Sequence, residues 1–248
     1  MESVKEIYKI GLGPSSSHTM GPNKAASIFA GRHNDAASFR VTLYGSLAAT
    51  GKGHMTDLAI QRAFGDKPSE IIWRADIVPE FHTNGMLFEA LDGNGKVTAD
   101  WTVYSIGGGY LSEGPGEESG KKQVYTRKTL EEVKEILAKE GYSFWEYVQS
   151  HEDNDLWDYL AEVWDAMQQS VREGLENDDK LPGCLRLRSK AKQYYARAQG
   201  LASSMKGRAL ACSYALAVSE MNARGGRVVT APTCGSCGVV PGVLYHLK

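Results

Sequence analysis

The sequence predicts an α+β fold, in which an N-terminal domain built around an antiparallel sheet is followed by an all-helical domain. Three observations support this prediction. Residues 7–109 mix helical and strand-like patterns, residues 111–122 are rich in glycine, glutamate and lysine, and the rest of the chain places its apolar residues mainly at helical spacing. We therefore expect an α+β domain over residues 1–125 and a helical domain over residues 126–248.

The first half alternates between helices and strands. Alternating apolar residues predict the strands, and the stretch Asp92-Gly93-Asn94-Gly95 is typical of the tight turn of a hairpin. A hairpin joins antiparallel strands, so we expect an antiparallel sheet with helices packed beside it. The predicted helices cover residues 21–31 and 56–64, and the predicted strands cover residues 38–45, 71–77, 85–91 and 101–106.

The second half is predicted from helical periodicity and from the residues that interrupt it. Thr129 lies three residues before Glu132, which is the spacing of a capping box at the start of a helix. Further helices are expected from about residue 155, over residues 190–205 and over residues 208–221. Two consecutive glycines then end the pattern, and the chain enters a turn rich in cysteine and glycine.

Composition narrows the class of protein. The formal net charge is -2 and the positive and negative residues are interspersed, so the sequence shows no basic cluster typical of a nucleic-acid-binding protein. No apolar run approaches the roughly 20 residues of a membrane span, and the N-terminus lacks a stretch of signal-peptide length. We therefore expect a cytoplasmic protein without membrane or nucleic-acid partners. In a reducing compartment, its four cysteines are expected to be buried thiols or metal ligands.

The first chemical motif is the turn over residues 11–22, which contains Ser15, Ser16, Ser17 and His18. Serine hydroxyls and free N–H groups at a helix start, with an imidazole nearby, suit a small anion such as a carboxylate. The alternative is a polar cap without a ligand. Three serines, a histidine and flanking glycines in one turn favour the ligand site.

Two further loops carry histidines. His54 follows a strand and a run of small residues, and a histidine on such a loop is a candidate general base. His82 and Asn84 precede a predicted strand, where they are either site residues or turn residues. Considered alone, His54 is more typical of a surface histidine, and His82 and Asn84 are more typical of turn residues. Only the combination of motifs favours a functional role for them.

Cys234 and Cys237 form a CxxC pair, which is compatible with zinc, an iron–sulfur cluster, a redox dithiol or chance. No second pair of zinc ligands follows, and the flanking pattern is helical rather than thioredoxin-like. Cys184 and Cys212 lie in other segments. We therefore expect a cluster whose other ligands lie elsewhere, with a zinc or redox protein as the alternative.

Together the motifs resemble the bacterial iron–sulfur L-serine dehydratases of the single-chain type, in the family's order and over nearly the whole chain. The resemblance implies an N-terminal domain shared with the allosteric serine-binding domain of some phosphoglycerate dehydrogenases, followed by a helical catalytic domain. It also implies a lyase that converts L-serine into pyruvate and ammonia. The matching segments are residues 13–22, 44–57, 82–86, 104–109, 181–183 and 222–241.

The resemblance also assigns roles to individual residues. His18 and His54 look like active-site residues, and His54 is the first choice for the base. The serines at positions 15–17 look like contacts to the substrate carboxylate. His82 and Asn84 look like supporting polar residues that bind the substrate.

The cofactor that the resemblance implies is a [4Fe–4S] cluster held by three cysteines, whose open iron polarises the substrate hydroxyl. Cys237 matches the first cluster ligand, and Cys234 is an additional cysteine. The family's other two cluster cysteines lie in segments that this chain lacks. We therefore expect this polypeptide alone to be inactive, or to receive the missing segment from another chain.

The expected partners are L-serine as substrate and a second copy of the chain in a homodimer, the commonest oligomer. The alternative function is a non-catalytic L-serine-binding regulatory module. An enzyme should need His54 and iron, whereas a sensor should bind serine without either.

Overall fold

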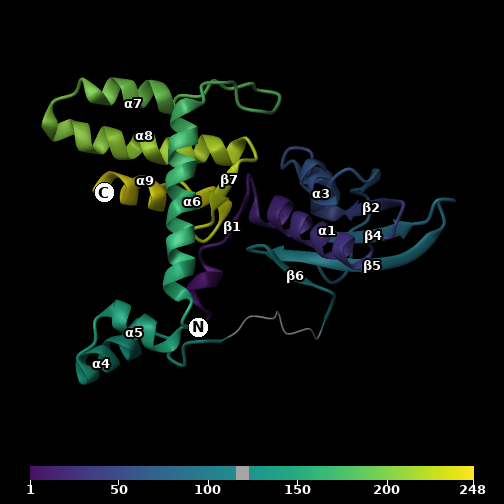
Figure 1. Ribbon diagram of the computed structural model, residues 1–248, viewed down its shortest axis with the longest axis horizontal. Helices are drawn as coiled ribbons and strands as arrows, with labels where there is room; N and C mark the ends of the chain where they lie inside the picture. Colours follow the sequence, from purple (N-terminus) through teal and green to yellow (C-terminus); the bar gives the residue numbers. More distant parts are fainter. Residues whose placement is uncertain (116–122) are drawn as a thin grey trace.

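The computed structural model describes residues 1–115 and 123–248, and it separates a sheet-containing part from a helical part (Figure 1). The predicted linker over residues 111–122 is only partly described. Leu111 and Ser112 belong to a strand, and residues 116–122 lie outside the described residues. Within the described ranges, no helix is both long enough and apolar enough to cross a lipid bilayer.

The first part contains a sheet of five strands in the order β3-β2-β4-β5-β6. The α+β class is confirmed, but the sheet is mixed rather than antiparallel, because β3 pairs with β2 in the parallel direction. Two helices lie between these strands in the chain, and such a helical connection returns the next strand in the same direction. The strands are β2 (Ser38–Tyr44), β3 (Ser69–Arg74), β4 (Gly85–Leu91), β5 (Val97–Gly107) and β6 (Tyr110–Ser112).

The core of this part forms where α1 (Gly21–Arg32) and α3 (Thr56–Phe64) pack against the sheet (Figure 1). Phe29 of α1 lies 5.6 Å from the ring of Phe88, and Phe64 of α3 stacks on Phe39 at 4.3 Å. Burial of such large apolar side chains is the main stabilising contribution to the domain. The short helix α2 (Gly45–Thr50) follows β2 directly.

The second part is built around the long helices α6 and α8, which contact each other closely. Thr129 caps α4, as predicted, because its side chain accepts the backbone N–H of Glu132 at 3.3 Å. The single helix expected over residues 190–205 is wrong, since α7 ends before Gly200 and a new helix begins at Ser203. The helices are α4 (Leu130–Glu140), α5 (Phe144–His151), α6 (Leu156–Glu176), α7 (Ala191–Gln199), α8 (Ser203–Ala223) and α9 (Val239–Leu247).

A two-stranded sheet joins the two parts. Strand β1 (Ile10–Leu12) pairs antiparallel with β7 (Arg227–Val229), so the expected all-helical second domain contains a strand. The side chain of Thr230 extends the junction, because it accepts the backbone N–H of Lys9 at 2.9 Å and donates to the carbonyl of Ile7 at 2.8 Å. This pairing positions the segments that follow β1 and β7 next to each other.

Candidate functional site

The predicted Ser/His motif forms a five-residue π-helical turn, η2 (Ser16–Met20), between β1 and α1. Ser15 caps this turn, because its hydroxyl accepts the backbone N–H of His18 at 3.1 Å. The hydroxyl of Thr19 in turn accepts the backbone N–H of Ser15 at 3.2 Å. Such π turns occur often at functional sites, since the wider turn changes where side chains point.

The imidazole of His18 lies between two hydroxyl groups. Its Nδ1 is 3.0 Å from the Ser17 hydroxyl, and its Nε2 is 3.1 Å from the hydroxyl of Ser46, the second residue of α2. Burial, together with the nearby His54, lowers the pKa of His18 below its ordinary value. The neutral imidazole is therefore favoured near pH 7.

His54 lies directly beside His18, with 4.7 Å between the ring centroids. Its Nδ1 is 3.0 Å from the carbonyl oxygen of Thr50. Because a carbonyl can only accept, Nδ1 of His54 carries the proton and donates it to this bond. The neutral ring then has its lone pair on Nε2, which makes His54 suited to accept a proton from a substrate.

Two buried threonines fix the backbones of the two histidines relative to each other. Thr19 donates to the carbonyl of His54 at 2.7 Å, and Thr56 donates to the carbonyl of His18 at 2.6 Å. Both threonines are almost completely buried. This reciprocal pair of hydrogen bonds holds the two histidine loops together without using either imidazole.

The loop over residues 82–84 is connected to the Ser/His turn through Ser105. The amide of Asn84 donates from Nδ2 to the carbonyl of Ser105 at 3.1 Å, and the Ser105 hydroxyl donates to the carbonyl of Ser17 at 2.7 Å. Nδ1 of His82 accepts the backbone N–H of Asn84 at 3.1 Å. Oδ1 of Asn84 is buried and has no hydrogen-bond partner among the described residues.

The structure thus brings together Asn84, the serines at 15–17, His18 and His54, which the sequence placed in separate motifs. His82 lies at the edge of this group, where its ring supports the backbone of Asn84. The hydrogen-bonding roles of four further residues were not predicted. All four lie inside segments that the sequence analysis singled out, which is a usable signal: Thr19, Ser46, Thr56 and Ser105.

The CxxC pair lies next to the Ser/His turn, on the other side of Met20. Cys234 begins the short helix η3 (Cys234–Ser236), and its thiol is 3.5 Å from the sulfur of Met20, the last residue of η2. Cys234 and Cys237 are each 1% exposed and belong to one apolar cluster. Burial raises the pKa of Cys234 to about 12 and that of Cys237 to about 11.

The described residues do not provide a complete set of ligands for an iron–sulfur cluster. No group of three or more His, Cys, Asp or Glu side chains that could hold a metal ion occurs among residues 1–115 and 123–248. Cys184 and Cys212 are exposed, whereas the CxxC thiols are buried. The three thiolates expected for a [4Fe–4S] cluster are therefore not assembled by the described residues.

Comparison with known proteins gives matches over nearly the whole chain. The family model described as the serine dehydratase beta chain matches residues 3–68 and 61–115, and that of the serine dehydratase alpha chain matches residues 121–248. An L-serine dehydratase of Streptomyces coelicolor is 32% identical over 98% of this chain and 65% of its own length.

Two further relatives give the same result. L-serine dehydratase 2 of Escherichia coli is 32% identical over 99% of this chain and 66% of the relative. An L-serine dehydratase of Mycobacterium tuberculosis is 33% identical over 98% of this chain and 64% of the relative. The chain therefore spans slightly less than two thirds of the length of these curated relatives.

Proposed function

Because this chain belongs to the serine dehydratase family, we propose that it carries the substrate site of an L-serine dehydratase, which forms pyruvate and ammonia from L-serine. The observation that carries the proposal is the pairing of His18 with His54 at 4.7 Å, beside the hydroxyls of Ser17 and Ser46. This arrangement offers a base and several hydrogen-bond donors within one site.

His54 acts as the general base in this proposal. Its Nδ1–H is held by the Thr50 carbonyl, so Nε2 accepts the α-proton of the substrate. The electron pair of the Cα–H bond forms a Cα–Cβ double bond while the Cβ–O bond breaks. The leaving hydroxide takes up a proton that His54 returns, which forms water and restores the neutral base. The resulting aminoacrylate tautomerises to an imine, which water hydrolyses to pyruvate and ammonia.

The other residues bind and orient the substrate. In this proposal, the hydroxyls of Ser15 and Ser17 donate hydrogen bonds to its carboxylate, and the contact of His18 with the Ser17 hydroxyl orients that hydroxyl. The buried Oδ1 of Asn84 is an acceptor suited to the α-ammonium group. An unpaired buried acceptor is costly, and an ammonium donor from the substrate would satisfy it.

The iron–sulfur cluster is part of the proposal for the complete enzyme. When bound, such a cluster supplies a Lewis acid that helps hydroxide to leave, and Cys237 is the proposed first ligand. The described residues do not assemble the three thiolates that such a cluster needs. We also propose that the 248-residue chain alone forms no pyruvate. The homodimer stays a prediction.

The test compares pyruvate formation with L-serine binding. A chain extended to the length of the longer relatives is reconstituted anaerobically with iron and sulfide, and its His54→Gln variant is expected to lose about 10²- to 10⁴-fold in pyruvate formation. Its L-serine affinity, measured by calorimetry, should change little. His33→Gln is the matched control, because His33 lies after the far end of α1 and packs on Phe29.

The outcomes separate the two candidate functions. No pyruvate from a version with a well-formed cluster would overturn the dehydratase proposal. Full pyruvate formation by the His54→Gln variant would overturn the role of His54 as base. L-serine binding that needs neither iron nor His54, without any pyruvate, would identify a serine-binding regulatory module.

A further inference from the structure

A cavity of about 550 Å³ lies at the junction of the two parts of the molecule. It is bounded by the N-terminal segment, one face of α1, strands β5 and β6, and Tyr159 in the first turn of α6. It shares no lining residue with the His18–His54 site. Its volume falls within the range of sites for small organic ligands, roughly 300–1,000 Å³.

The described lining residues carry more positive than negative charge. Lys5, Lys9, Lys24 and Arg32 supply four cations, whereas Glu6 and Glu113 supply two carboxylates. An excess of cations in a concave site concentrates anions there, because the low-dielectric walls focus the field. The cavity is therefore suited to an anion rather than to a cation or a neutral ligand.

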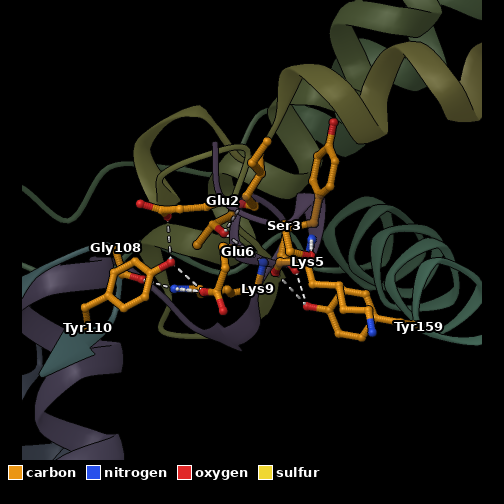
Figure 2. Close-up of polar contacts among 11 residues, drawn as sticks. Glu2, Ser3, Lys5, Glu6, Lys9, Gly108, Tyr110 and Tyr159 are labelled. Carbon is orange, nitrogen blue, oxygen red and sulfur yellow. Dashed lines mark hydrogen bonds and ion pairs between the residues drawn. The ribbon is translucent and has the colours of Figure 1, made fainter. Parts of the chain in front are cut away.

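The N-terminal wall of this cavity is a fixed network (Figure 2). Lys9 lies between the Glu6 carboxylate at 2.9 Å and the carbonyl of Gly108 at 3.0 Å, and its ammonium is 3.2 Å from the centroid of the Tyr110 ring. Burial raises the pKa of the Glu6 carboxyl, but hydrogen bonds from the Tyr110 hydroxyl and from Lys9 lower it more, so the pKa lies below its usual range. Lys5 forms an ion pair with Asp155.

The opposite wall differs in its contacts, although Lys24 is near enough to Glu6 for its charge to help lower the pKa of that carboxylate. Lys24 and Arg32 are exposed residues of α1, and neither forms a salt bridge to a carboxylate among the described residues. They lie eight residues apart, which is about 12 Å along the helix axis, and Ile28 lies between them on the same face. Two anionic groups of one ligand can therefore be bound at once, one at each end.

Most side chains on the floor between these two cations are apolar, and Nε1 of Trp101 donates to the Glu113 carboxylate at 2.8 Å. Ile28, Trp101, Val103 and Leu111 line it, and the guanidinium of Arg32 lies 5.0 Å from the centroid of the Trp101 ring. Stacking on an aromatic face orients the guanidinium and leaves its N–H edge available to an oxyanion. A ligand with a carbon body can cover this floor, whereas an isolated inorganic ion cannot.

We propose that this cavity binds a small organic anion carrying two or more carboxylate or phosphate groups, held between Lys24 and Arg32 over Ile28 and Trp101. The site is separate from the proposed substrate site, so the proposal does not depend on the dehydratase function. Lys9 links the cavity to the junction, because its backbone is bonded to Thr230.

The test uses citrate as the probe, with inorganic phosphate and acetate for comparison, and calorimetry on the 248-residue chain. Citrate is expected to bind with a Kd below about 1 mM. Each of Lys24→Ala and Arg32→Ala should raise this Kd about tenfold, which corresponds to about 1.4 kcal/mol. Arg172→Ala and Lys134→Ala, at exposed positions on α6 and α4, should leave it unchanged.

A second measurement needs no variant. Citrate should protect Lys24, but not Lys134, from acetylation by an amine-reactive reagent, as read by mass spectrometry of the wild-type chain. No citrate binding at 10 mM, or equal Kd values in the wild type and both cavity variants, would overturn the proposal. Phosphate binding as tightly as citrate would overturn the requirement for an organic body and for two anionic groups.

Discussion

The rings of His18 and His54 lie 4.7 Å apart, so a proton placed on one disfavours a proton on the other. The carbonyl of Thr50 accepts a hydrogen bond from Nδ1–H of His54, so Nε2 is the nitrogen of His54 that can accept a proton. Ser17 and Ser46 can each donate or accept, so they accommodate either neutral form of His18. The lowered pKa of His18 favours its neutral form near pH 7, and both hydroxyls can bond to that form.

A pH dependence of stability follows from the lowered pKa of His18, whose causes are burial and then His54. A histidine with a folded-state pKa below its unfolded value stabilises the fold above that unfolded value. This contribution is lost as the pH falls through the folded pKa. We expect urea unfolding to show a loss of stability below about pH 6.5 that is reduced in His18→Gln. His246→Gln, at an exposed position, should retain the full loss.

The thiols give a second prediction at this scale. Because burial raises the pKa of Cys234 and Cys237 to about 12 and about 11, both remain protonated at neutral pH and are shielded from reagents. Iodoacetamide at pH 8 should therefore modify Cys184 and Cys212, which are exposed, and spare the buried pair. Mass spectrometry should find all four modified after denaturation in urea. Rapid labelling of Cys237 in the folded chain would contradict the burial.

The elements that were predicted best have strong local patterns. The helix expected over residues 56–64 and the strand expected over residues 85–91 have the bounds of α3 and β4. The hairpin at Asp92-Gly93-Asn94-Gly95 joins β4 to β5 as expected. These segments combine clear periodicity with turn residues, so local sequence is enough to specify them.

The elements that were missed are short or depend on distant partners. Helix α5 has eight residues, and its capping box at Ser143 and Glu146 was present in the sequence as a signal. Strands β1 and β7 have three residues each and come from opposite ends of the chain, so no local pattern predicts their pairing. The parallel pairing of β3 with β2 likewise depends on how the intervening helices pack.

The crossing of α6 and α8 gives a prediction at the element scale. A Cβ atom added to Gly174 would lie 2.3 Å from the backbone oxygen of Ala217, so the helices must separate to accommodate it. Gly174→Ala should destabilise the protein by about 1–3 kcal/mol in urea unfolding. Gly31→Ala is the matched control, because nothing lies near its added Cβ, and it should stabilise α1 by about 0.5–1 kcal/mol. Equal effects of the two substitutions would contradict close packing at this crossing.

In the molecule as a whole, the candidate site depends on contacts between segments that are distant in sequence. The residue types of the site were predictable, because the serines at 15–17, His18 and His54 lie in recognisable turns. Their convergence was not, since it requires Thr56 to hold the backbone of His18 and Ser105 to hold that of Ser17. Those bonds join segments that are far apart in the sequence and that only the tertiary fold brings together.

The junction of the two parts positions the Ser/His turn beside the CxxC turn. The carbonyl of Gly226 accepts the backbone N–H of Gly13 at 3.0 Å, and Nδ2 of Asn222 donates to the carbonyl of Pro14 at 3.2 Å. The thioether of Met20 then contacts the thiol of Cys234. Movement at β1 and β7 is therefore expected to change the distance between the histidines and the cysteines.

Thr230 tests this junction, because its buried hydroxyl bonds to the backbones of both Ile7 and Lys9. Thr230→Val keeps the shape of the side chain but leaves the Ile7 carbonyl and the Lys9 N–H without their partner. We therefore expect the free energy of unfolding to fall by about 2 kcal/mol. Hydrogen exchange at the Lys9 and Ile10 amides should accelerate more than exchange in α1. Thr98→Val makes the same chemical change on the exposed hairpin and should stay within about 0.5 kcal/mol of the wild type. Unchanged exchange at β1 in Thr230→Val would show that the two parts are held together by other contacts.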